Sequence, residues 1–495
     1  MRQDNRGSIA IFMALILLVL TNLFFSMVEA VRIYEYHMEA RVLASKLCAD
    51  AFSEYEPYMW QEYGILGLDM AYGHSAATTA NVENRMLDFT EDRRDLEVTD
   101  ITIDSYGLLT DDGGKPFIKQ CAMAALAMLP QEALDKLQAQ TQAVSEIQDE
   151  DMDIDDMVGR GIDAIEEAQT TIESTDDNEK DLTSLDESVE TDNSDTQISI
   201  TKENNPIEIY RTIKEQGWVG LVLGERELSE KVLSDESVVS KRELRQGSSD
   251  NPIQLNMADY CLYGWYLGQQ FGNYSSVKEG RCLDYEMEYI VAGGSSDRDN
   301  IAAVVLRLLA IRELCNISTI MTNETMVQQA YAVAVSIAGV TGVPAIIEPV
   351  KIAVIAIWAL LESILDVRAL VNGKKIPIMK TYGEWTSRVE NLGSCLSMDA
   401  SAKESENGIG YGTYLYIFLI LIGDSNRAYR PMDLIEQTLR SHEGFEGTRM
   451  DNMAYEMNIN LEIQGEPILY SFMPLQQAGM ELYQCNAYGE ISYIL

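Results

Sequence analysis

The sequence predicts an α+β protein. We expect an N-terminal transmembrane helix that continues as a stalk, a small α/β sheet unit, and a mainly helical second half with C-terminal strands. Three observations support this class: an uncharged apolar run near the N-terminus, alternating apolar residues near residue 100 and again near the C-terminus, and helical periodicity through much of the chain after residue 206. With 495 residues, of which 46% are hydrophobic, the chain can bury real cores in two or three domains.

The predicted anchor runs from Ile9 to Val28 without a charged residue. About 20 apolar residues match the ~30 Å thickness of a bilayer's hydrocarbon core. Two arginines precede the run and Glu29 follows it, so the positive-inside rule places the N-terminus in the cytoplasm and the bulk of the chain outside. Residues 1–30 are therefore expected to form a cytoplasmic tip and a single-pass anchor in the cell membrane.

Two other interpretations of this segment stay open. A signal peptide would be cut after Ala30, although its apolar region is usually shorter than this one. A pilin-like leader would be cut between Gly7 and Ser8, because Gly7 closes a short basic stretch just before the apolar helix. Pilins carry Glu five residues past the cut, where this chain has Phe12. Gly7 and Ser8 therefore remain a hypothetical processing site.

Two polar residues of this segment are candidates for contacts with partner helices. Asn22 lies inside the apolar run and Glu29 lies at its end. Polar side chains in a membrane helix tend to bond to neighbouring helices, since lipid offers them no hydrogen bonds. A stalk helix is expected over residues 31–62, because apolar residues recur at helical spacing at Val31, Tyr34, Met38 and Val42.

Residues 63–140 are predicted to form the small α/β unit. The alternation expected of a half-buried strand is imperfect in the second strand, so its register stays open. The expected elements are a strand at 62–71, a helix at 81–93, a strand at 96–107 and a helix at 114–137.

Residues 141–205 are predicted to be a disordered linker, because acidic residues dominate there and few aromatic residues could form a core. Alternating aspartates at 149, 151, 153 and 155 are spaced like ligands of a calcium loop. Ile154 stands where an EF-hand needs Gly, and Arg160 stands where it needs Glu, so we predict no calcium site.

Residues 206–495 are predicted to form an α+β domain around a buried helical hairpin. For this hairpin, at 330–367, a second membrane insertion is the less favoured alternative. Glycines, prolines and charges interrupt it, and its longest clean run, Ile352 to Leu361, is about half a span. The segments 458–464, 467–473 and 489–495 have strand patterns that could return to the first sheet.

The overall charge limits the classes of molecule that this chain can bind. The formal net charge is -42 and the pI is about 4.3. Nucleic acid is excluded as a partner, because binding to it depends on Lys and Arg neutralising phosphates. The membrane remains the partner that the residues themselves indicate.

The sequence predicts no catalytic, cofactor-binding or metal-binding residues, and no cofactor. Seven cysteines lack a CxxC pair, so we expect most of them to be buried, with Cys261 and Cys282 as the pair to test for a disulfide. Three histidines give a His-based triad few candidates. Glu362, in an apolar helix beside Trp358, is the most notable acid, and we expect it to pair with one of the arginines Arg307, Arg312 or Arg368.

Several stretches together resemble an uncharacterised membrane-anchored family of low-GC Gram-positive bacteria, similar in plan to the minor pilin-like proteins of tight-adherence (Tad, or Flp) pilus systems. The resemblance spans most of the chain outside the acidic linker. It rests on RGSIAIFMALILLVL with EAVRI, YGILGLD, YEMEYIVAGGSSDRDN, LLAIRELCN, AIWALLESILDVRALVNGKKIPI with Trp385, and MDLIEQTLR.

This resemblance implies a non-enzymatic, extracytoplasmic component of a Tad-like pilus or secretion assembly, with the assembly's proteins as partners. The family carries no known catalytic residues. Two alternatives stay open: a cell-surface hydrolase of wall polymers, which would need two convergent carboxylates in a cleft, and an adhesin, which would need an exposed apolar or aromatic patch.

Overall fold

The computed structural model describes residues 6–74, 76–90, 97–129, 206–224, 226–233, 238–341, 347–421, 424–465 and 483–494. The predicted linker at 141–205, the aspartates within it and the strand pattern at 467–473 lie outside the described residues. Contacts divide the chain into two compact units. Unit 1 contains residues 1–128, 242–260 and 439–495, and unit 2 contains residues 129–241 and 261–438.

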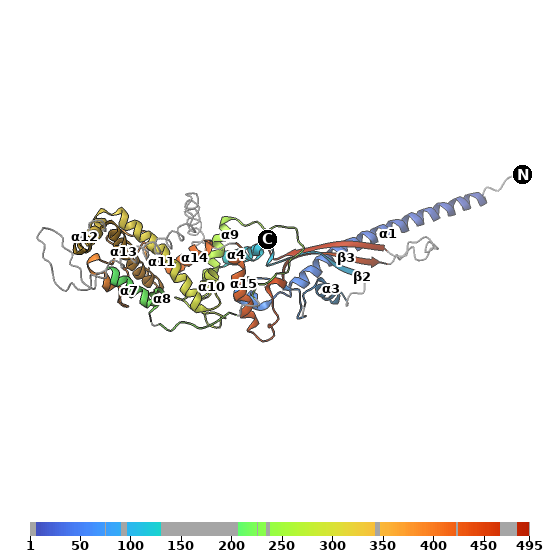
Figure 1. Cartoon of the computed structure of the whole chain (residues 1–495). Coiled ribbons are helices and arrows are strands. Elements are labelled where there is room, and N and C mark those ends of the chain that lie inside the picture. The colour runs from blue at the N-terminus through green and yellow to red at the C-terminus, as the bar shows by residue number, and fades with distance from the viewer. Residues whose placement is uncertain are drawn as a thin grey trace. The chain divides into compact units, whose positions relative to one another are not determined.

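The long helix of unit 1 is α1, which runs without interruption from Arg6 to Phe52 (Figure 1). It includes the predicted anchor and most of the predicted stalk, but it ends ten residues before the expected limit at residue 62. The chain then turns, and α2 (Pro57–Tyr63) begins with Pro57 at its first position. Proline cannot continue a helix interior, because its ring clashes with the preceding turn, so it ends one helix and starts the next.

The sheet of unit 1 is antiparallel and is built around β3 (Met453–Gly465). β2 (Glu97–Leu108) and β4 (Tyr483–Ser492) pair with the same stretch of β3, so they lie on its opposite sides. The short β1 (Leu68–Asp69) pairs with the start of β3. The C-terminal strands therefore do return to the first sheet, as the sequence suggested.

Irregularities in the pairing of β2 with β3 explain the imperfect alternation of β2, because two of the three place an extra residue in β2 and the third places one in β3. The register shifts between Val98 and Asp100, between Ile103 and Ser105, and next to Gly107. Each extra residue turns the following side chains to the other face of the sheet. A strict period of two is therefore lost in the sequence, although the strand itself is continuous.

The remaining elements of unit 1 are short. α3 is capped by the hydroxyl of Thr78, which accepts a hydrogen bond from the Asn81 amide. The elements are α3 (Thr79–Asp88), the 3-10 turn η1 (Asp111–Gly114), α4 (Lys115–Met128) and the 3-10 turn η5 (Met450–Asn452).

Unit 2 is mainly helical, with α13 (Ile347–Val371) at its centre. α13 contacts α11, α12, α8, α7 and η4, and almost every described side chain from Ala353 to Val371 is buried. The other helices are α7 (Pro206–Gln216), α8 (Trp218–Leu223), α9 (Met257–Gln270), α10 (Glu286–Ala292), α11 (Asp297–Thr322), α12 (Glu324–Thr341), η4 (Val389–Leu396), α14 (Tyr411–Leu421) and α15 (Asp424–Arg440). Together, the two units confirm the predicted α+β class.

The close approach of β4 to α1 depends on Gly489. A Cβ atom at this position would lie 2.8 Å from both the Ala44 carbonyl oxygen and the Cys48 Sγ. We therefore expect Gly489→Ala to lower the free energy of unfolding by about 1–3 kcal/mol, because the strand must move away from the helix. Gly447→Ala is the matched control, since nothing lies within 4 Å of its added methyl group. Urea denaturation of the full chain in mild detergent tests this, and equal midpoints for the two variants would contradict it.

Candidate functional site

The candidate functional site is α1, because its two halves meet different surroundings. From Ile9 to Met27 the described side chains are exposed, and the most apolar window has a mean hydropathy of 2.5. From Ala40 to Phe52 one face of the helix is buried against β3 and β4. Among the described helices, α1 alone is long and apolar enough to cross a membrane.

The buried half of α1 joins the sheet through a continuous apolar core. Leu43 and Leu47 on the helix and Ile459 and Leu461 on β3 are each at most 1% exposed. At the end of the helix, the Phe52 and Tyr493 rings lie 4.7 Å apart, and the Tyr493 hydroxyl donates to the Phe52 carbonyl oxygen. The helix is thus fixed to the sheet along three turns, so a movement of one must move the other.

The two polar residues that the sequence predicts as contacts of this helix, Asn22 and Glu29, differ in their exposure. Glu29 is only 2% exposed and interacts within the chain, so its carboxylate does not face outward. Asn22 is exposed. The neighbouring Thr21 hydroxyl donates to the Leu17 carbonyl oxygen at 2.8 Å, whereas the Asn22 amide makes no hydrogen bond within the described part of the chain. Asn22 is therefore a polar group of the apolar segment that has no hydrogen-bond partner among the described residues.

The residues at the hypothetical processing site, Gly7 and Ser8, lie in the first turn of α1, which begins at Arg6.

A thiol and an imidazole meet where α1 lies against β4. The Sγ atom of Cys485 is 2.7 Å from Nδ1 of His37. Burial raises the pKa of the Cys485 thiol, so the thiol stays protonated and is a poor nucleophile. This pair was not predicted from the sequence, because the two residues are 448 positions apart. We interpret it as a packing contact of the helix with the sheet.

The other two histidines do not complete a catalytic group with this pair in the described structure. His74 is exposed in a turn. His442 stacks on the ring of Tyr58 at 4.8 Å. Cys261 and Cys282 are free thiols, so the structure gives no disulfide between them. Six of the seven cysteines are buried, as predicted.

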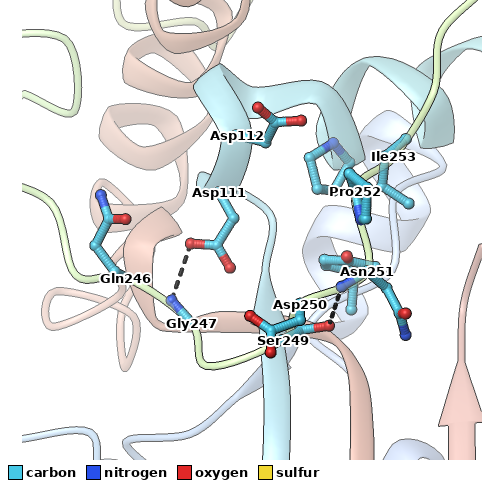
Figure 2. A pocket seen from close by; sticks show the side chains of 11 residues that line it. Asp111, Asp112, Gln246, Gly247, Ser249, Asp250, Asn251, Pro252 and Ile253 are labelled. Carbon is cyan, nitrogen blue, oxygen red and sulfur yellow. Dashed lines mark hydrogen bonds between the residues drawn. The ribbon is translucent and has the colours of Figure 1, made fainter.

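Unit 1 has an open polar pocket of about 240 Å³ (Figure 2). The Asp111 carboxylate, on its wall, accepts hydrogen bonds from the Leu108 amide at 2.7 Å and from the Gly247 amide at 2.9 Å. The neighbouring Asp112 forms an ion pair with Lys115 at 2.8 Å. Both carboxylates hold the protein's own groups. Within the described residues, no group of metal-ligating side chains converges.

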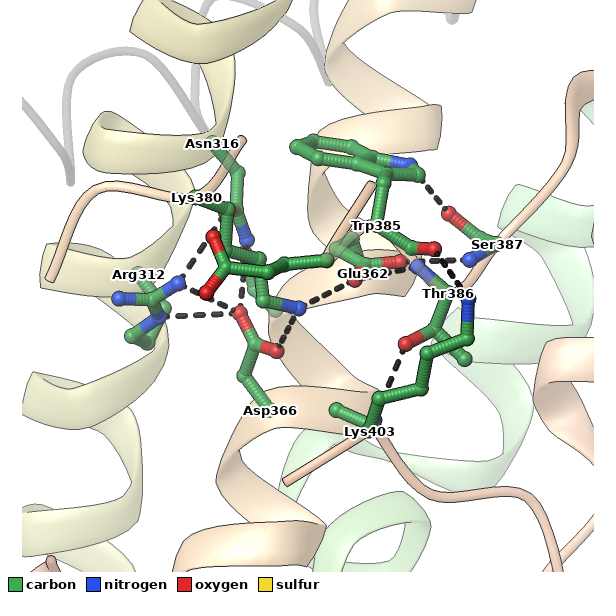
Figure 3. Close-up of polar contacts among 12 residues, drawn as sticks. Arg312, Asn316, Glu362, Asp366, Lys380, Trp385, Thr386, Ser387 and Lys403 are labelled. Carbon is green, nitrogen blue, oxygen red and sulfur yellow. Dashed lines mark hydrogen bonds and ion pairs between the residues drawn. The ribbon is translucent and has the colours of Figure 1, made fainter. Parts of the chain in front are cut away.

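Unit 2 contains a buried network of charges between α11, α13 and the segment 377–387 (Figure 3). Lys380 forms ion pairs with both Glu362 and Asp366, and all three side chains are fully buried. Asp366 also accepts two hydrogen bonds from the Arg312 guanidinium, at 2.8 and 3.0 Å. The expected arginine partner of Glu362 is therefore wrong: the partner is Lys380, 18 residues further along the chain and outside the helix.

The carboxylate of Glu362 is also held by backbone groups. It accepts hydrogen bonds from the Thr386 amide at 3.0 Å and from the Ser387 amide at 2.8 Å. The indoles of Trp358 and Trp385 both donate to the Ser387 hydroxyl, each at 2.9 Å. Because every group is paired and sealed from solvent, this network fixes the segment 377–387 to α13 and offers no access to a substrate.

A second set of buried acids lies in the first turn of α10. Glu286 and Glu288 are fully buried, and they accept hydrogen bonds from the Gly272 amide at 2.7 Å and the Tyr274 amide at 2.9 Å. Burial raises the pKa of each carboxyl group to about 7. These acids are therefore protonated to a large extent at neutral pH and hold the turn that precedes α10.

Lys380→Met is expected to destabilise the chain strongly, because it leaves the buried Glu362 carboxylate without a cation and Asp366 with Arg312 alone. The expected loss is about 3–5 kcal/mol in the free energy of unfolding. The control is Lys351→Met, which removes the partner of the largely exposed Glu348 and should change stability by less than about 1 kcal/mol. Urea denaturation followed by tryptophan fluorescence measures both, and a tolerated Lys380→Met would show that the network is dispensable.

The raised pKa values of Glu286 and Glu288 predict a pH dependence. The unfolded chain releases these protons near pH 4.5 and the folded chain near pH 7, so the folded state is favoured at low pH and loses this advantage as the pH rises through 7. Glu288→Gln removes one of these titrating groups. Between pH 5 and pH 8, the free energy of unfolding of the variant should therefore fall by about 1–3 kcal/mol less than that of the parent chain. Parallel pH profiles of unfolding for the two proteins would contradict this.

Comparison with known proteins gives one match. Neither the curated proteins nor the solved structures contain a match to this chain. A family profile described as "Family of unknown function (DUF5702)" matches residues 196–465, which is more than half of the chain. The matched region includes the charge network of unit 2, the acids of α10 and strand β3, and it ends at the last residue of that strand. The chain therefore belongs to the DUF5702 family.

Proposed function

We propose that this chain is a non-enzymatic, membrane-anchored component of a Tad-like pilus or secretion assembly, with its bulk outside the cytoplasm. One observation carries the proposal: a single 47-residue helix is exposed and apolar in its first half and packed on a sheet in its second half. A helix of this length extends about 70 Å, so it can cross a bilayer and continue well beyond it.

The continuity of α1 suits a protein whose function depends on holding its folded body at a fixed place relative to its anchor. A flexible linker after the membrane would let the folded body move freely, whereas an unbroken helix transmits a shift of the anchor to the sheet. Anchor, stalk and folded head are also the plan implied by the resemblance to minor pilin-like proteins of low-GC Gram-positive bacteria. The basic residues before the apolar run and Glu29 after it support the extracytoplasmic orientation.

The chemistry of the described residues is consistent with a role other than catalysis. The acids that the sequence singled out, above all Glu362, are sealed and paired. The pocket carboxylates Asp111 and Asp112 hold the protein's own groups. The residues of the family resemblance that lie in unit 2 include Trp358, Glu362 and Asp366 of the buried network, which supports a structural role for them.

Asn22 gives the proposal a direct test. Purified through an affinity tag in mild detergent, the full chain should bring pilus assembly proteins of the native membrane with it. Asn22→Leu should weaken this association by about 1 kcal/mol, or roughly fivefold, because its amide loses a hydrogen bond to a partner helix. Thr21→Val is the control, since the Thr21 hydroxyl is already bonded within α1. Mass spectrometry that finds no assembly proteins with the parent chain would contradict the proposal.

The mature N-terminus provides an independent measurement. Intact mass and N-terminal sequencing of protein from native membranes would show Ser8 first if the leader is processed as in pilins. An N-terminus at Met1 would leave an unprocessed anchor. An N-terminus at Val31 would contradict anchoring itself, because the apolar run would have been removed.

A further inference from the structure

The buried charge network of unit 2 holds an amine in contact with two carboxylates. Nζ of Lys380 contacts Oδ1 of Asp366 and Oε1 of Glu362, and all three side chains are fully buried (Figure 3). An amine and a carboxylic acid are the two halves of an amide bond. In solution such a pair does not condense, because both groups are charged and water favours the separate acid and amine. Contact in a site without water removes this disadvantage.

The two oxygens of the Asp366 carboxylate have different surroundings. Oδ2 accepts hydrogen bonds from Nε and Nη2 of Arg312, at 3.0 and 2.8 Å, and from the Asn316 amide at 3.1 Å. Oδ1 accepts no hydrogen bond from a described residue and contacts the Lys380 ammonium. Three donors on one oxygen stabilise negative charge there, as the donors of an oxyanion hole do. Oδ2 is therefore placed to carry charge during an attack on Cγ, and Oδ1 is placed to leave.

The second carboxylate, that of Glu362, is placed to carry protons. It accepts hydrogen bonds from the Thr386 amide at 3.0 Å and from the Ser387 amide at 2.8 Å, which hold it against the Lys380 ammonium. A carboxylate that contacts an amine can take its proton and return it to a leaving oxygen, so it acts first as general base and then as general acid. Backbone amides hold both oxygens of Glu362, so Asp366, with its unbonded Oδ1, is the carboxyl group that reacts.

We propose that Lys380 and Asp366 form an isopeptide bond in the folded protein, with Glu362 as the proton carrier. Glu362 takes a proton from Nζ, and the electron pair of the nitrogen attacks Cγ of Asp366. The bond between Cγ and Oδ1 then breaks. Of the three ammonium protons, two leave with Oδ1 as water and one stays on the amide nitrogen. Glu362 ends as it began, and the reaction needs no oxidant or reductant.

The bond lowers the cost of burying this network. The network contains two cations and two anions: Lys380, Arg312, Glu362 and Asp366. The reaction removes one cation and one anion, and the remaining charges of Arg312 and Glu362 still balance. Buried ions are costly even when they are paired, so the amide is favoured over the ion pair that it replaces. Hydrolysis needs water at the same fully buried place, so the bond persists once it has formed.

The consequence is a covalent link between α13 and the segment 377–387, which the ion pairs alone hold by charge. An amide bond does not separate when the pH or the salt concentration changes. The reaction occurs once in each chain and uses no external substrate, so the sealed site is no obstacle to it. The inference concerns the head alone and does not rest on the proposed function.

Peptide mass spectrometry of the full chain, purified in mild detergent and digested with trypsin, tests the bond. Trypsin cuts after Lys and Arg, and an isopeptide bond blocks the cut after Lys380. The digest should therefore contain peptide 352–368 joined to peptide 376–388, lighter than the two together by one water molecule, about 18 Da. Fragmentation should place the bond at Asp366. Finding peptide 352–368 only in its unlinked form, or a bond at Glu362, would overturn the inference.

A second lysine provides an internal control in the same digest. Lys119 forms an ion pair with Asp259 at 2.9 Å, but its side chain is 24% exposed. Water reaches this pair, so trypsin should cut after Lys119 as after any other lysine. A linked peptide at Lys119 in the same amount as at Lys380 would show that contact alone, or the treatment of the sample, produces the link, and would overturn the inference.

Glu362→Gln tests the proton carrier. It keeps the size of the side chain and an oxygen that can accept a hydrogen bond, but it cannot take up a proton, so the linked fraction should fall at least about tenfold. Glu313→Gln is the matched control, because Glu313 is a buried acid of the same unit that accepts a hydrogen bond from Ser363 at 3.3 Å. Its linked fraction should equal that of the parent chain. An equal fall in both variants, or no fall in Glu362→Gln, would overturn the role of Glu362.

Discussion

The packing of the second half of α1 on β3 and β4 is the interaction on which unit 1 depends. The sheet is formed by strands from both ends of the chain, since β2 comes before residue 110 and β3 and β4 come after residue 450. Its central strand needs an apolar cover, and the buried face of α1 provides it. Because α1 is also the described helix that is long and apolar enough to cross a membrane, one helix both covers the sheet and contains the candidate membrane span.

Unit 2 depends on a different kind of interaction. Its central helix α13 is apolar on most sides, yet it carries Glu362 and Asp366 into the core, where unpaired charges would be very costly. Lys380 and Arg312 neutralise them from outside the helix, and this fixes both the segment 377–387 and α11 against α13. Such networks specify one packing arrangement, because any shift leaves a buried charge unpaired.

The exposed surface of α1 connects the fold to the proposed function. Anchors that only hold a protein at a membrane need no particular face once they leave the bilayer. After the apolar run from Ile9 to Val28, this helix keeps exposed apolar side chains from Val31 to Val42 while its other face is packed on the sheet. An assembly subunit has a use for such a helix, since one face can bind the protein's own head and the other a neighbour.

The sequence by itself determined the features that depend on local order along the chain. The long N-terminal apolar helix, the α+β class and the strand character of residues 96–107 all follow from runs and periods of neighbouring residues. The sequence analysis did not predict the end of α1 at Phe52, although Pro57 is present in the sequence. The helical spacing of apolar residues continues toward Pro57, so the stalk was expected to extend to residue 62.

The tertiary structure alone decided which residues meet. The periodic residues Val31 to Val42 indicated a helix but not which of its faces would be buried, since two apolar faces share the same turns. Glu362 was recognised as a buried acid, but its partner could not be identified, because Lys380 reaches it from a segment after the helix. Pairing across the sheet and ion pairing in a core depend on distances in space, and local sequence patterns do not contain them.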